Sequence, residues 1–93
     1  LYLNESERKD ALVLYQSLNL AKTMIKNKLR QTKIVINRMK NLIQKKDSAR
    51  IDYIAIVDPD NLKPVETIKQ NCLVLLAVWI GKTRLIDNIL IKI

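Results

Sequence analysis

The stretch Ile51-Asp-Tyr-Ile-Ala-Ile-Val57 marks the point where the chain changes from helical to extended character. Most of its residues are β-branched or aromatic, which favours a β-strand. The apolar run Cys72-Leu-Val-Leu-Leu-Ala-Val-Trp-Ile80 predicts a second strand. A third strand is expected at Ile89–Ile93, after a polar turn around Asp87-Asn88. The second half of the chain is therefore predicted to be a small antiparallel sheet.

The connection between the first two predicted strands carries turn residues. Asp58-Pro59-Asp60-Asn61 predicts a turn, because proline presets φ and Asp and Asn tolerate tight backbone positions. Leu62–Val65 is expected to be a short extended piece at a sheet edge, since Pro64 has no N–H to donate to a central ladder.

The first half of the chain has helical periodicity. Asn4 and Glu7 have the spacing of a capping box, and they predict a helix of about 22 residues with one apolar stripe. That stripe comprises Ala11, Leu14, Tyr15, Leu18, Ala21, Ile25 and Leu29. A second helix is expected from Lys28 or Thr32 to Lys45, and the joint falls within 26–31, where no glycine marks it. Its apolar face would be Leu29, Ile34 or Val35, Met39, Leu42 and Ile43.

These elements predict an α+β fold with two N-terminal helices packed on one face of a small three-stranded antiparallel sheet. A length of 93 residues allows one core, and the hydrophobic content of 48% is typical of globular domains. The chain opens on Leu1 and not on methionine, so we expect either that an N-terminal part was removed or that this is a piece of a longer protein.

The composition excludes several kinds of active site. With no His, one Cys and one Gly, the chain cannot build a Cys/His zinc site, a His-based triad or a glycine-rich phosphate loop. We therefore predict no catalytic residue and no metal site within this chain. Cys72 is expected to be a small buried hydrophobe, so nothing indicates an oxidising compartment. Its apolar run is too short to span a bilayer and no signal peptide is visible, which favours a soluble cytoplasmic protein without a membrane partner.

The net charge of +8 is confined to the first half of the chain. Residues 1–50 hold twelve basic and four acidic side chains, whereas residues 51–93 hold five of each. A basic helical layer raises the possibility of a nucleic-acid partner, but a solvated outer face is the favoured interpretation. The aromatic residues that base stacking would need are few, namely Tyr2, Tyr15, Tyr53 and Trp79. Tyr15 and Trp79 are expected to lie in the core.

The tail Trp79-Ile-Gly-Lys-Thr-Arg-Leu-Ile-Asp-Asn88 is the most specific motif. Gly81 permits a turn with positive φ, and Arg84 and Asp87 could pair and tie that turn to the sheet. Asn88 could bond its own backbone. From the residues alone, these four positions predict a structural corner, with contact to a ligand as the alternative.

The same decapeptide closely resembles the C-terminal end of the pantothenate synthetase (pantoate–β-alanine ligase) family. Three further segments agree in order and spacing: 1–8, 11–18, and 51–58 with Leu62 and Val65. The resemblance covers essentially the whole chain, although residues 23–48 share only helical pattern and basic charge.

The resemblance implies that residues 1–93 are the C-terminal lid domain of an enzyme whose N-terminal Rossmann-like, ATP-binding domain is not in this chain. The family condenses pantoate with β-alanine through a pantoyl adenylate and releases AMP and pyrophosphate, a step towards coenzyme A. The full-length enzyme would use ATP and Mg²⁺ and would be a cytoplasmic homodimer, whereas the fragment alone is expected to be inactive and to bind no cofactor. The family's Ser-Ser-Arg-Asn phosphate-binding signature is expected immediately before Leu1, so no ATP-binding residue is assigned here. Lys22 and Lys28 cannot be assigned to ATP, and for Tyr2, the nearest candidate by position, a packing role is favoured.

Two other classes of function are kept as alternatives. One is a free-standing basic module that binds nucleic acid or another polyanion. This alternative rests only on the positive charge and does not account for the tail motif. The other is a structural domain that dimerises through an open sheet edge at 73–79.

Overall fold

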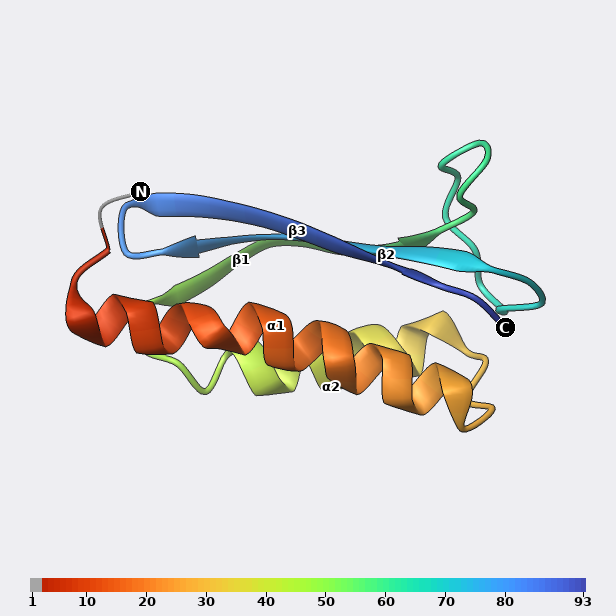
Figure 1. Cartoon of the computed structure of the whole chain (residues 1–93), viewed down its shortest axis with the longest axis horizontal. Helices are drawn as coiled ribbons and strands as arrows, with labels where there is room; N and C mark the ends of the chain where they lie inside the picture. The colour runs from red at the N-terminus through yellow and green to blue at the C-terminus, as the bar shows by residue number, and fades with distance from the viewer. Residues whose placement is uncertain (1–2) are drawn as a thin grey trace.

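The computed structural model describes residues 3–93 and has two layers, one helical and one of β-sheet (Figure 1). The elements in chain order are α1 (Glu5–Lys26), α2 (Thr32–Ile43), β1 (Ala49–Val57), β2 (Cys72–Ile80) and β3 (Thr83–Ile91). The strands form one antiparallel sheet in the order β1-β2-β3, and both helices cover the same face. The predicted α+β architecture is confirmed. Tyr2 lies outside the described residues.

Helix α1 begins where its capping box predicts. The side-chain oxygen of Asn4 accepts from the backbone N–H of Glu7 at 2.7 Å, and the Glu7 carboxylate accepts from the N–H of Asn4 at 3.1 Å. The helix has the predicted 22 residues. Its buried residues are Val13, Leu14, Ser17, Leu18, Ala21, Met24 and Ile25. The placement of Tyr15 in the core is wrong: its side chain is 65% exposed, because it lies about 100° around the helix from buried Leu14.

The joint between the helices is a Schellman motif without glycine. Lys28 adopts φ 72°, its N–H donates to Ile25 O at 3.0 Å, and the N–H of Leu29 donates to Met24 O at 2.9 Å. The Arg30 guanidinium also donates to Ile25 O at 2.8 Å, which satisfies a carbonyl at the helix end. Helix α2 then begins at Thr32, the later of the two predicted starts.

The sheet is built around β2, whose bounds match the prediction. Strand β1 begins two residues before the predicted Ile51, and its register with β2 shifts between Ile51 and Tyr53, so Asp52 is the extra residue of a bulge. The residues of β2 that face the helices, such as Val74, Leu76 and Val78, are fully buried.

The third strand is present, but its predicted start at Ile89 and the predicted turn at Asp87-Asn88 are wrong. β3 begins at Thr83 and runs through Asp87 and Asn88, which pair with Leu76 and Leu75 of β2. The turn lies earlier, at Gly81-Lys82, between the paired residues Ile80 and Thr83. Asp and Asn are disfavoured in strands, but on an exposed edge strand the pairing with β2 decides the conformation.

The connection from β1 to β2 forms the predicted turn. The Asp58 carboxylate accepts from the N–H of Asp60 at 2.7 Å, and Leu62 takes a positive φ of 60°. Pro64 forms an isolated bridge with Val57 at the edge of β1, in agreement with the predicted edge position. The buried Thr32 hydroxyl donates to Val65 O at 2.7 Å and so ties this connection to the start of α2.

Candidate functional site

The β2–β3 turn and the start of α1 form one corner of the molecule. Gly81 has φ +59°, as predicted, and its N–H donates to Ser48 O at 2.9 Å. The turn also leaves no room for a side chain, since a Cβ on Gly81 would lie 1.8 Å from the Glu7 carboxylate. Glu7, the second residue of the capping box of α1, thus packs directly on the hairpin turn. Sequence reasoning missed this second role of Glu7.

Arg84 is paired across the sheet and not along its own strand. Its Nε and a terminal nitrogen both lie 2.9 Å from one Asp52 oxygen, and the two side chains are 37% and 42% exposed. The predicted pairing of Arg84 with Asp87 is wrong, because residues three apart in a strand point to opposite faces of the sheet. Asp52, at the bulge in β1, supplies the carboxylate instead, and no pattern in the sequence predicts that bulge.

Asp87 and Asn88 lie in the middle of β3, away from the turn. Here the Asp87 carboxylate accepts from the N–H of Asn88 at 2.8 Å, so the local side-chain bond comes from Asp87 and not from the predicted Asn88. The tail motif therefore divides in two. Gly81 and Arg84 belong to the corner, whereas Asp87 and Asn88 belong to an exposed edge strand.

Arg50 and Trp79 complete the corner on the sheet side. In the sheet register Arg50 pairs with Trp79, and Trp79 pairs with Arg84. The Arg50 guanidinium lies 5.5 Å from the Trp79 ring centroid, within cation–π range. Trp79 is only partly buried and faces away from the helices, so its predicted place in the core is wrong.

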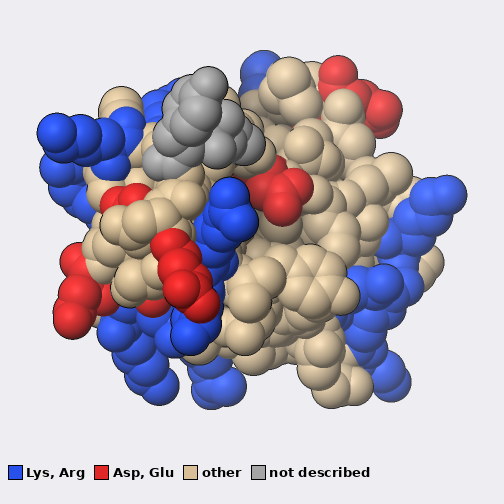
Figure 2. All heavy atoms as spheres, turned by 60° about the vertical axis from the view of Figure 1, so that its left-hand side comes forward, with Lys and Arg blue, Asp and Glu red and all other residues tan. Residues whose placement is uncertain are grey.

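The unassigned lysines of the helices lie far from this corner. Helix α1 is about 33 Å long, and Lys22 and Lys28 lie near or beyond its C-terminal end, opposite the end that Glu7 occupies. Figure 2 shows Lys and Arg side chains in several separate groups around the face in view, with uncharged surface between them. One basic residue of the first half, Arg50, belongs to the sheet. On the face shown, the charge is spread and does not form one continuous stripe.

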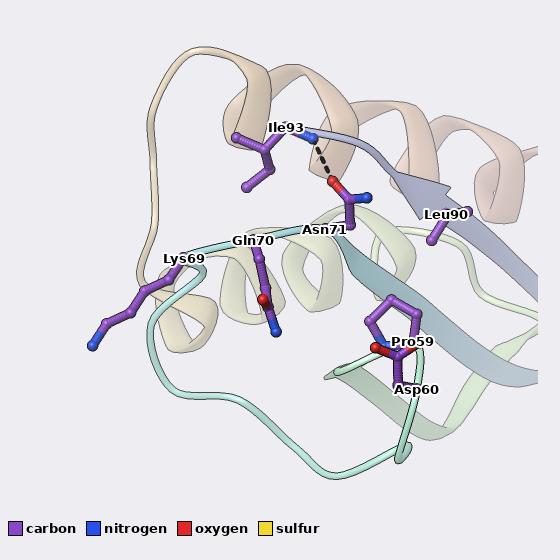
Figure 3. Close-up of a pocket in the computed structure, with 7 residues that line it drawn as sticks. All are labelled: Pro59, Asp60, Lys69, Gln70, Asn71, Leu90 and Ile93. Carbon is purple, nitrogen blue, oxygen red and sulfur yellow. Dashed lines mark hydrogen bonds between the residues drawn. The ribbon is translucent and has the colours of Figure 1, made fainter.

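An open hollow of about 540 Å³ lies at the other end of the sheet (Figure 3). Pro59, Asp60, Lys69, Gln70, Asn71, Leu90 and Ile93 line it. The Asn71 side chain accepts from the N–H of Ile93 at 2.9 Å, so it holds the chain near its C-terminal residue. One carboxylate and one ammonium at an open hollow make no nucleophile–base pair.

The rest of residues 3–93 likewise offers few groups for catalysis or metal binding. These residues contain no group of three or more His, Cys, Asp or Glu side chains placed to hold a metal. Cys72 is 1% exposed, and burial raises the pKa of its thiol despite the opposing charge of Arg30, which keeps it protonated and unreactive. Neither helix in this part of the chain has the length and apolarity needed to cross a membrane.

Comparison with known proteins places these features in a family. A profile of the Pantoate-beta-alanine ligase family matches residues 1–90. Pantothenate synthetase from Clostridium botulinum (strain Loch Maree / Type A3) is 47% identical over 92 residues, which cover 99% of this chain and 33% of the relative. Pantothenate synthetase from Thermosipho africanus is 46% identical over 90 residues, which cover 97% of this chain and 32% of the relative.

A crystal structure of pantothenate synthetase from Thermus thermophilus superposes with a TM-score of 0.85 at 27% identity. The match covers 95% of this chain and 32% of that one. The chain thus spans about a third of the length of the relatives it matches. The fold, the tail motif and the sequence match agree, and the chain belongs to the pantoate–β-alanine ligase family.

Proposed function

We propose that this chain is the C-terminal lid domain of a pantothenate synthetase. The observation that carries the proposal is the family match over residues 1–90 by a chain that spans only about a third of its relatives. In this proposal the catalytic N-terminal domain of the parent enzyme binds ATP, pantoate and β-alanine. The parent is a cytoplasmic homodimer that uses Mg²⁺, and nucleic acid is not among its partners.

The chemistry of the reaction explains why a lid is useful. The pantoate carboxylate attacks the α-phosphorus of ATP, pyrophosphate leaves, and the β-alanine amine then attacks the acyl carbon and displaces AMP. The intermediate acyl adenylate is readily hydrolysed, so exclusion of water between the two steps protects it. In this proposal the contribution of the domain is the enclosure of the site.

A lid must move as one body, and three features of this domain support that. Its helices and sheet share one core, in which Ile25, Met39 and Leu76 are fully buried. The capping box holds one end of α1, and the Schellman motif holds the other. Because α1 begins against Gly81, a hinge before residue 3 would move the domain from this corner.

A chimera tests the proposal. The matching third of the Clostridium botulinum enzyme is replaced by residues 1–93, and pantothenate formation from ATP, pantoate and β-alanine is measured. We expect activity from the chimera and none from the same enzyme with that third deleted. An inactive chimera that is folded and binds ATP would contradict the proposal.

The lid role has its own readout, the ratio of AMP to pantothenate. With an effective lid, the two products form one for one, because β-alanine traps the adenylate before water does. A chimera that releases AMP steadily in the absence of β-alanine would show that this domain does not protect the intermediate.

A further inference from the structure

The sheet has a second, uncovered face, which we call the outer face. It comprises the side chains that point away from the helices: Arg50, Tyr53, Ala55, Val57, Leu73, Leu75, Ala77, Trp79, Arg84, Ile86, Asn88 and Leu90. Within residues 3–93 no helix lies over it (Figure 1). Ile86 is 60% exposed, Leu90 48% and Tyr53 39%. In the register Tyr53, Ala77 and Ile86 form one row, and Val57, Leu73 and Leu90 another, so the apolar side chains are contiguous across the three strands.

The composition of the outer face is that of a covered surface. An antiparallel sheet with one solvated face normally alternates apolar and polar residues, but Cys72–Ile80 is apolar on both faces, as in strands buried on both sides. None of the three strands contains a lysine, although lysine is abundant in the rest of the chain. Aromatic residues and arginine with few lysines are typical of protein interfaces. The edge strand β3 also lacks the lysines that usually protect an exposed edge.

The likeness to longer relatives indicates what covers this face. About two thirds of each relative's chain lies outside the matched region, which is enough for a whole domain. Helix α1 begins at the β2–β3 turn, so a preceding segment would reach the sheet at the end occupied by Arg50, Trp79 and Arg84. We propose that the outer face docks against the catalytic domain that precedes this chain in the parent enzyme. This inference rests on the proposed function, and it identifies the sheet as the side of the lid that meets that domain.

Thiol labelling at two matched positions tests the inference. Ile86→Cys lies on the outer face and Leu12→Cys on the exposed side of α1, and the native side chains are almost equally exposed, at 60% and 59%. Each variant is made in the 93-residue chain and in the chimera, and labelling of each position is followed by peptide mass spectrometry. Native Cys72 is buried in the 93-residue chain.

We expect Ile86→Cys to be labelled about tenfold more slowly in the chimera than in the 93-residue chain, as for a lid that is docked most of the time. Labelling of Leu12→Cys should be similar in both. Equal rates for Ile86→Cys, or protection of Leu12→Cys instead, would overturn the inference. Protection of Ile86→Cys that is already present in the 93-residue chain and grows with its concentration would assign the face to a second copy, and would also overturn it.

The activity of the chimera separates this inference from the proposed function. An active chimera with an unprotected Ile86→Cys would leave the function standing and refute the docking surface. An inactive chimera with a protected Ile86→Cys would support docking and count against the function.

Discussion

Replacement of Gly81 by alanine should destabilise the domain through two separate effects. The left-handed φ of +59° is open to glycine but unfavourable for an L-residue with a Cβ, by about 1–2 kcal/mol. The new methyl group would also lie 1.8 Å from a Glu7 carboxylate oxygen, so that side chain must move. The clashing oxygen is Oε2, whereas Oε1 accepts from the N–H of Asn4, so movement of the carboxylate weakens this half of the capping box and leaves the bond from the N–H of Glu7 to Asn4 in place.

The size of the combined effect follows from these two parts. Loss of a whole helix cap typically costs about 1 kcal/mol and only half of this one is affected, so the sum for Gly81→Ala is about 1.5–2.5 kcal/mol of unfolding free energy. For a domain of this length, such a loss lowers the melting temperature by about 6–20 °C. Urea and thermal unfolding of the 93-residue chain, followed by circular dichroism, would measure it.

A double-mutant cycle separates the backbone part from the contact with Glu7. In a Glu7→Ala background the methyl group meets no carboxylate, so Gly81→Ala should cost only the backbone term, about 1–2 kcal/mol. Lys82→Ala, at the neighbouring exposed turn position, is the control and should change stability by about 0.5 kcal/mol or less. A loss below about 0.5 kcal/mol for Gly81→Ala, or the same loss with and without Glu7, would refute this reasoning.

Four further outcomes are expected. Asp52→Asn should cost at most about 1 kcal/mol, and less in high salt, since the pair with Arg84 is partly exposed; a loss above about 2 kcal/mol in urea unfolding would contradict this. Burial raises the pKa of the Cys72 thiol, so the stability that the protonated thiol contributes is complete below its ordinary pKa and is lost as the pH rises through the raised pKa. The free energy of unfolding should therefore fall more in this alkaline range for the native chain than for Cys72→Ala. An equal fall in the two proteins would contradict the prediction. The purified 93-residue chain should form no pantothenate from ATP, pantoate and β-alanine, and measurable product would overturn the lid assignment. If the basic helical layer bound nucleic acid, a mobility-shift assay would show affinity that falls steeply with salt; we expect no shift at moderate salt.

The elements that local signals specify were predicted closely. The spacing of Asn4 and Glu7 located the start of α1, and the continuous apolar run located β2. The joint between the helices was harder to place, since Lys28 takes the left-handed position that glycine usually holds. Its conformation depends on hydrogen bonds from Leu29 and Arg30 that spacing alone does not reveal.

The errors in the sheet arise from long-range pairing. Asp87 and Asn88 have the composition of a turn, yet their pairing with β2 holds them in a strand. The pairing of Arg84 with Asp52 depends on a bulge in another strand, 32 residues away in sequence. Register and bulges are properties of two strands together, so a pattern read along one segment cannot supply them.

The misplacement of Trp79 has a different cause, and it bears on the docking surface. Its run is apolar on both faces, whereas in the 93-residue chain Leu73, Leu75 and Trp79 on the outer face are only partly buried. The apolar pattern of a strand reflects its burial in the whole protein and not only in one domain. If the preceding domain covers the outer face, the prediction fails only because part of the covering lies outside this chain. Retarded labelling of Ile86→Cys in the chimera would then support both the docking surface and the burial that the sequence of β2 predicts.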